Sequence, residues 1–114
     1  MSRSRTTLTV LEDSCCPTTL ADPLPRDVAE ELAHLLKAVA DPARLQLLSL
    51  IGRSADGQVC QCDLTGPLGL SQPTVSHHLR VLVDAGVLSR ERRGSWVWFS
   101  LVPDRLSQIA AIFG

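Results

Sequence analysis

The sequence lacks the features that would assign it to a membrane or to an enzyme class. No apolar run in its 114 residues approaches the length of a membrane-spanning helix. The first residues, MSRSRTTLTVLEDSCCP, have no apolar core and no small-residue cleavage site of a secretory signal, so we expect a cytoplasmic protein without a membrane partner. A catalytic Cys-x-x-Cys pair and a phosphate-binding glycine loop are also missing, which disfavours an arsenate or thiol reductase.

Charge is scarce overall but unevenly distributed. The formal net charge is −1. Seven acidic residues face two basic ones between positions 12 and 41, whereas four arginines face two acids between positions 72 and 93. A basic segment on a weakly acidic chain indicates a nucleic-acid footprint. The length predicts one domain, and a helical domain this small often completes its core by dimerising.

The four cysteines form two close pairs, Cys15 with Cys16 and Cys60 with Cys62. In a cytosolic chain such pairs indicate metal ligation or redox sensing. Several thiolates without an imidazole or carboxylate cluster favour a soft ion. As(III) and Sb(III) prefer three thiolates, whereas Zn(II) and Cd(II) prefer four ligands, which all four cysteines together also supply. A thiol redox switch and free structural cysteines are the alternatives.

Element signals divide the chain into a polar, flexible N-terminal arm, residues 1–22, and a folded domain, residues 23–114. A first helix from Arg26 is followed by a central helix with Asp41 as N-cap and Pro42 at its first position. A short helix near Cys62 and Asp63 precedes a helix that begins after Ser71 and ends at Gly86. Two β-type runs around Gly94-Ser95 predict a hairpin, and a last helix starts at Pro103. This order predicts a mainly α fold with a β-hairpin, the winged helix-turn-helix.

The helix after Ser71 has one apolar stripe, Val75, Leu79 and Leu82, that predicts core packing. Its opposite face and the hairpin carry residues suited to base edges and phosphates in double-stranded DNA. The alternatives are an ordinary solvated helix face and a hairpin edge protected by arginines. We expect His78 to be a buried structural residue, and Trp96 and Trp98 to pack in the core or between subunits. The predicted DNA-binding residues are Ser71, Gln72, Thr74, Ser76, His77, Arg80, Arg90, Arg92 and Arg93.

The stretch VCQCDL raises a geometric problem. Residues i and i+2 of a helix point about 200° apart, so Cys60 and Cys62 cannot bind one ion while both are helical. Either Cys60 lies outside the helix or the first turn must unwind. Ion binding at this place would then distort the helix that supports the DNA-reading helix.

The text LLKAVADPARLQLLSLI, VCQCDL and GLSQPTVSHHLRVLVDAGVLSRERRGSWVWFSL resembles the ArsR family of metal- and metalloid-responsive repressors, over roughly residues 30 to 102. The CxCDL segment resembles its arsenic-sensing branch. The resemblance implies a homodimer built on the first and last helices. It also implies a repressor of arsenic-resistance genes that binds an imperfect inverted repeat in operator DNA and leaves it when As(III) or Sb(III) binds.

In that branch, Cys60 and Cys62 match the first two sensor thiols, but Thr65 stands where the third is expected. Some relatives use a vicinal N-terminal pair in an inter-subunit site, so the resemblance implies a metal site drawn from Cys15, Cys16, Cys60 and Cys62. The last-helix site of zinc-sensing relatives has no counterpart, since residues 103–114 contain no His or Cys. A thiol-redox-responsive or a Cd-, Pb- or Zn-responsive winged-helix regulator is the alternative.

Overall fold

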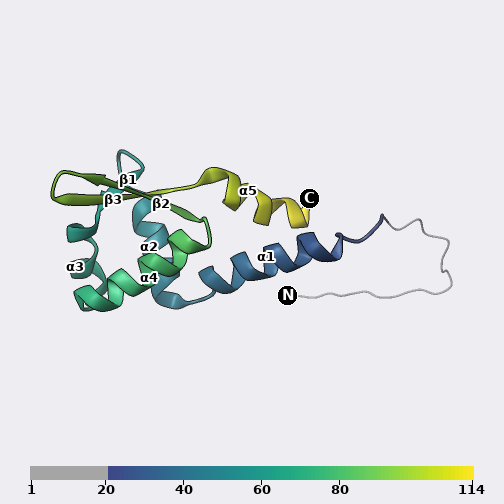
Figure 1. Ribbon diagram of the computed structural model, residues 1–114, viewed down its shortest axis with the longest axis horizontal. Coiled ribbons are helices and arrows are strands. Elements are labelled where there is room, and N and C mark those ends of the chain that lie inside the picture. The colour runs from purple at the N-terminus through teal and green to yellow at the C-terminus, as the bar shows by residue number, and fades with distance from the viewer. Residues whose placement is uncertain (1–20) are drawn as a thin grey trace.

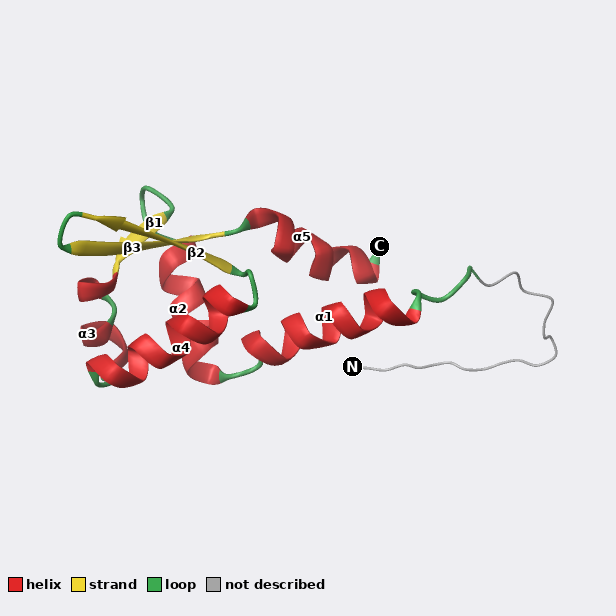
Figure 2. Cartoon of the chain, viewed as in Figure 1, coloured by secondary structure: helices red, strands yellow, loops and turns green. Residues whose placement is uncertain are grey.

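The computed structural model describes residues 21–114 (Figure 1). The fold consists of helices and one small antiparallel sheet (Figure 2), so the predicted mainly α fold with a hairpin is confirmed. In chain order the elements are α1 Arg26–Val39, α2 Pro42–Gly52, β1 Gln58–Cys60, the 3₁₀ turn η2 Gln61–Asp63, α3 Thr65–Leu68, α4 Gln72–Asp84, β2 Leu88–Arg93, β3 Trp96–Leu101, α5 Pro103–Ala110 and the 3₁₀ turn η3 Ala111–Phe113.

The two predicted N-caps are confirmed. Asp41 accepts hydrogen bonds from the backbone N–H groups of Ala43, at 2.9 Å, and Arg44, at 3.2 Å. The bond from Arg44 is the main reason that the pKa of Asp41 lies below its ordinary value. Ser71 accepts a hydrogen bond from the backbone N–H of Thr74 at 3.3 Å and so begins α4. Each cap uses a side-chain oxygen to satisfy an N–H group that has no partner within its helix.

Helix α4 ends at Gly86, as predicted from the sequence. Gly86 has a φ of 82°, a conformation that costs a residue with a Cβ atom. The backbone N–H of Val87 donates to the carbonyl of Leu82, and that of Gly86 donates to the carbonyl of Val83, which together form a Schellman cap. A Cβ atom at position 86 would also lie 2.9 Å from Nε of Arg105, so the cap lets α5 approach the end of α4.

The core lies around α2, which contacts α1, α4, β1 and β3. Leu47 and Ile51 of α2 have no exposed surface, whereas Leu45 on its other side is 53% exposed. The predicted α4 stripe is confirmed as core. The buried apolar cluster comprises Leu32, Leu35, Leu47, Ile51, Leu64, Val75, Leu79, Leu82, Val87, Leu88 and Phe99.

The sheet has three strands in the order β1-β3-β2, and β1 was not predicted. The short helix expected near Cys62 begins as a 3₁₀ helix, Gln61–Asp63, and becomes α-helical only at Thr65. A three-residue strand is too short to show an alternating pattern, and its hydrogen bonds come from a strand far along the chain, with Cys60 opposite Trp98. The segment that holds the thiols is thereby tied to the hairpin.

Helices α1 and α5 pack beside each other (Figure 1). Leu106 and Ile109 of α5 are partly buried against the core, but Phe113 is 85% exposed. A cavity of about 260 Å³ between the two helices is lined mainly by apolar side chains, including Leu24, Val28 and Ile112. None of the helices within residues 21–114 combines the length and apolar character that crossing a bilayer requires.

Candidate functional site

The thiols of Cys60 and Cys62 converge. Cys60 is buried at the end of β1, Cys62 is exposed in η2, and the Cys62 thiol donates a hydrogen bond to the Cys60 sulfur over 2.7 Å. The turn from strand to 3₁₀ geometry between them removes the divergence that a continuous helix would impose. Of the two geometries expected from the sequence, the one with Cys60 outside the helix is therefore confirmed.

The environment of Cys62 keeps its thiol protonated. Its hydrogen bond to Cys60 raises the pKa of Cys62 to about 11, and loss of solvation and the nearby Asp63 carboxylate act in the same direction. The thiolate, not the thiol, is the nucleophile in oxidation and alkylation. In this arrangement Cys62 is a poor nucleophile at neutral pH.

The other predicted thiols, Cys15 and Cys16, and all but the last two residues of the predicted arm, lie outside the described residues. Within residues 21–114, no group of three or more His, Cys, Asp or Glu side chains is arranged to hold a metal ion. Thr65, the position of the missing third thiol, is the first residue of α3. The described part of the chain thus brings together two of the four predicted ligands.

Helix α4, hereafter the recognition helix, presents several predicted DNA contacts at its N-terminal end. Gln72 and His77 are exposed. Ser71 serves as the N-cap, and its hydroxyl lies 2.8 Å from that of Thr74. Gln72 and His77 therefore have the side chains that are most available for contacts outside the chain.

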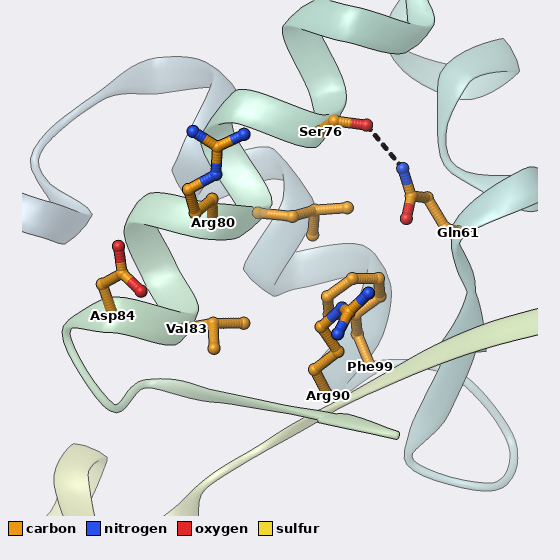
Figure 3. A pocket seen from close by; sticks show the side chains of 8 residues that line it. Gln61, Ser76, Arg80, Val83, Asp84, Arg90 and Phe99 are labelled. Atoms are coloured by element: carbon orange, nitrogen blue, oxygen red, sulfur yellow. Dashed lines mark hydrogen bonds between the residues drawn. The ribbon is translucent and has the colours of Figure 1, made fainter. Parts of the chain in front are cut away.

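Ser76 differs from its neighbours because its hydroxyl is already engaged. It is half-buried, and Nε2 of Gln61 donates a hydrogen bond to its Oγ at 2.6 Å (Figure 3). Gln61 is the residue between the two thiols. Sequence reasoning missed Gln61, because its partner is 15 positions away and no local pattern indicates the contact.

A cavity of about 420 Å³ lies between the recognition helix and the hairpin (Figure 3). Arg80 of α4 and Arg90 of β2 both line it, together with Gln61 and Ser76. Asp84 is the acidic residue in the same lining. Two guanidinium groups from separate elements suit this concavity to an anionic group such as a backbone phosphate.

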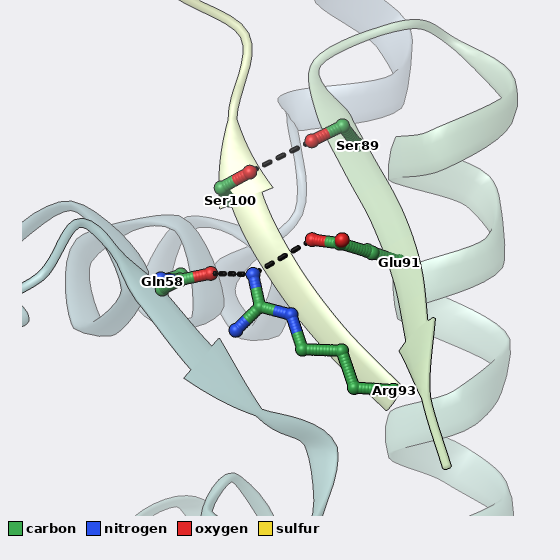
Figure 4. A network of polar contacts seen from close by, with 5 residues as sticks. All are labelled: Gln58, Ser89, Glu91, Arg93 and Ser100. Carbon is green, nitrogen blue, oxygen red and sulfur yellow. Dashed lines mark hydrogen bonds and ion pairs between the residues drawn. The ribbon is translucent and has the colours of Figure 1, made fainter. Parts of the chain in front are cut away.

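The structure places Arg93 on the other face of the hairpin. One of its terminal nitrogens donates hydrogen bonds to Oε1 of Gln58 and Oε1 of Glu91, both at 2.7 Å (Figure 4). The bond from Arg93 lowers the pKa of Glu91, and the guanidinium carbon lies 5.1 Å from the centroid of the Trp98 ring. Arg93 thus links β2 to β1, while Arg92 is exposed and points to the opposite face of the strand.

Two further side chains have structural positions. His78 is half-buried rather than fully buried, and Nη1 of Arg44 donates to its Nδ1 at 3.2 Å, which joins α2 to α4. Trp96 is 57% exposed near the hairpin tip, so the expectation that it packs in the core of this chain is wrong. Trp98 is half-buried beside Arg93.

Helices α3 and α4 with the adjoining hairpin form a winged helix-turn-helix, the fold of DNA-binding transcriptional regulators. Residues 41–90 match the family described as bacterial regulatory protein, arsR family. The chain belongs to this ArsR family of transcriptional repressors. Its family and its fold are those of DNA-binding regulators, which are not enzymes.

Three relatives illustrate the similarity. An HTH-type transcriptional regulator of Methanocaldococcus jannaschii is 38% identical over 80 residues, which cover 70% of this chain and 88% of that protein. An arsenical resistance operon repressor of Staphylococcus xylosus is 36% identical over 80 residues, covering 70% and 74%. The solved structure of HlyU from Vibrio cholerae has a TM-score of 0.65 and 26% identity, covering 77% of this chain and 94% of that one.

Proposed function

We propose that this repressor binds operator DNA as a homodimer and is released when As(III) or Sb(III) binds its cysteine thiolates, which derepresses arsenic-resistance genes. The observation that carries the proposal is the convergence of the Cys60 and Cys62 thiols at 2.7 Å. Two sulfurs so placed form a ready bidentate ligand for one soft ion. The two cysteines also flank Gln61, whose side chain contacts the recognition helix.

The third thiolate comes from Cys15 or Cys16 in this proposal. A pyramidal As(III) site needs three sulfurs, and the described residues supply two. Nine residues separate Cys16 from the start of α1 at Arg26, and an extended chain covers about 3.3 Å per residue, so the arm has a reach of about 30 Å. The proposal requires the Cys60–Cys62 segment of one subunit to lie within this reach of the start of α1 in the other.

Proton balance favours a metalloid over a divalent metal. As(III) is present in neutral water as uncharged arsenous acid, and three thiols displace its three hydroxyl groups as three water molecules, with no net release of protons. A divalent cation must instead displace thiol protons into solution, so its affinity falls as pH falls.

The dimer in the proposal uses the faces of α1 and α5. The apolar cavity between these helices and the exposed Phe113 leave hydrophobic surface that a second copy would cover. A two-fold symmetric dimer presents two recognition helices, which suits an inverted repeat. On each half-site, Gln72 and His77 would meet base edges, and Arg80 and Arg90 a phosphate.

The alternative is a regulator that responds to thiol oxidation. The short distance between the sulfurs favours it, because two adjacent thiols are candidates for a disulfide. The raised pKa of Cys62 opposes it, because oxidation begins from the thiolate. The two proposals predict different inducers and are separated by one experiment.

The test is an anisotropy titration of a duplex that the protein itself has selected from a random-sequence library. As(III), Sb(III), Cd(II) and Zn(II) are added under strong reductant, and peroxide is added without it. We expect release by As(III) and Sb(III), loss of that release in Cys60→Ser or Cys62→Ser, and unchanged affinity of these variants for DNA alone. Release by peroxide, with none by arsenite, would instead establish the redox alternative.

A further inference from the structure

We propose that Gln61 transmits occupancy of the Cys60–Cys62 pair to the recognition helix through its hydrogen bond to Ser76, an inference that rests on the function proposed above. Gln61 is a positioning residue and not a ligand. Its Nε2 atom lies 2.6 Å from Oγ of Ser76, the shortest side-chain link that the structure describes between the thiol segment and α4.

The three side chains of the thiol segment, residues 60–62, point in different directions. The sulfurs of Cys60 and Cys62 meet each other, whereas the Gln61 side chain extends toward α4 (Figure 3). One short stretch of backbone carries all three side chains. Ligation that holds both sulfurs on one ion restrains the backbone on either side of Gln61, and so restrains where its side chain can reach.

The hydrogen bond tolerates little movement. Nε2 of Gln61 lies 2.6 Å from Oγ of Ser76, and a separation near 3.6 Å no longer counts as a hydrogen bond. A change of about 1 Å in the position of the Gln61 amide when an ion is bound therefore breaks the link to Ser76.

The position of Ser76 explains why this bond affects DNA affinity. Ser76 lies one helical turn after Gln72 and immediately before His77. Gln61 and Ser76 also line the cavity that contains Arg80 and Arg90. The intact bond fixes the recognition helix against the thiol segment and the sheet, which is the ion-free, DNA-competent arrangement. Breaking it removes that link and leaves the recognition helix free to shift relative to the hairpin.

The test uses Gln61→Leu, which removes the donor and keeps a side chain of similar size. DNA affinity is measured by anisotropy on the selected duplex, and As(III) binding is measured separately by sulfur-to-arsenic charge-transfer absorption. We expect ion-free Gln61→Leu to bind the duplex about three- to tenfold more weakly, the range for one hydrogen bond. As(III) should bind free Gln61→Leu at least as tightly as wild type, because ion binding no longer has to break this bond, while the ratio of DNA affinities without and with As(III) falls by the same three- to tenfold.

Ser76→Ala should reproduce both effects, and the double variant should add nothing further, because the two residues act as one pair. Gln58→Leu is the matched control. It removes a glutamine from the same segment, but Gln58 contacts Arg93 and not the recognition helix, so its affinity ratio should equal that of wild type. Circular dichroism establishes that each variant is folded, and Gln61→Ala replaces Gln61→Leu if the leucine perturbs folding.

Different results would contradict the proposed function and the coupling through Gln61 and Ser76, hereafter the relay. If wild type binds DNA and does not respond to As(III) or Sb(III), the proposed function is wrong. The relay is judged by the variants themselves. Wild-type DNA affinity and a wild-type affinity ratio in Gln61→Leu, or additive losses in the double variant, would overturn it.

Discussion

Cys60 on β1 and Trp98 on β3 are direct partners in the antiparallel register. Side chains of paired residues lie on the same face of a sheet. An indole ring therefore stands beside one of the two converging thiols, and the Arg93 guanidinium lies over that ring.

This pairing makes Trp98 a reporter of ion binding that does not require DNA. We expect As(III) to change the fluorescence of Trp98 in a saturable way. The chain has one other tryptophan, Trp96, so Trp96→Phe isolates the signal. Trp98→Phe should lose most of the change, and Cys60→Ser should abolish it at the same arsenite concentration. A full response in Trp98→Phe would place the bound ion elsewhere.

The raised pKa of Cys62 predicts slow alkylation. At pH 7 a thiol with a pKa of about 11 is almost entirely protonated, and its rate with iodoacetamide should increase continuously up to at least pH 10. Cys60→Ala removes the main cause of the raised pKa, so alkylation at pH 7 should accelerate. Peptide-resolved mass spectrometry separates Cys62 from Cys15 and Cys16. A plateau of the wild-type rate below pH 9 would contradict the assigned environment.

The recognition helix and the hairpin should contribute differently to DNA binding. Gln72→Ala should cost about 1–3 kcal/mol on the selected duplex and little on random DNA, because it removes a base contact. Arg92→Ala should weaken both duplexes alike and reduce the salt slope by about 1. Anisotropy titrations at several salt concentrations measure both effects. Equal losses on both duplexes for Gln72→Ala would exclude base readout by this residue.

Association through α1 and α5 can be tested at Phe113, which is 85% exposed in the single chain. Placing a charge there should raise the dimer dissociation constant by about 10- to 100-fold, from the free energy of burying an aromatic side chain. Sedimentation velocity at micromolar concentrations compares Phe113→Glu with wild type. Leu45→Glu is the control, because Leu45 is also exposed but lies on α2. A wild-type monomer that binds a single half-site would refute the dimer.

The arm is tested by its cysteines and by its removal. One of Cys15→Ser and Cys16→Ser should lose most of the release by arsenite, and the other should respond like wild type, because the proposed site takes one thiolate from the arm. Both should keep DNA affinity, since neither belongs to the recognition helix. A shortened protein that begins at Leu20 should keep DNA affinity and lose the release. Release of DNA from this shortened protein at the wild-type arsenite concentration would exclude the arm from the sensor.

Local signals explain what could be predicted from the sequence. Asp41, Ser71 and Gly86 act within a few residues of where they stand, and the structure confirms all three caps. Alternation along a strand is equally local, and it places Arg92 and Arg93 on opposite faces of the hairpin. Strand β1 could not be predicted, because three residues show no period and their partner strand lies far along the chain.

The candidate site was less predictable than the fold. The cysteines could be identified by residue type, but their geometry depends on a change from strand to 3₁₀ turn at Gln61 that no residue there signals. Ser76 was predicted as a DNA contact from its position on the helix, whereas in the structure its hydroxyl receives a hydrogen bond from Gln61. Contacts between side chains distant in the sequence depend on tertiary packing, which helical periodicity does not contain.

Because Gln61 stands between the two cysteines without binding the ion in this proposal, the choice of ion and the size of the response would depend on different residues. The cysteines on either side would determine which ion is detected, while the glutamine would determine how strongly detection changes DNA affinity. In a whole-cell arsenic reporter, substitutions at position 61 would then adjust the background expression and the dynamic range without altering the analyte. Substitutions at positions 60 and 62 would alter the analyte itself.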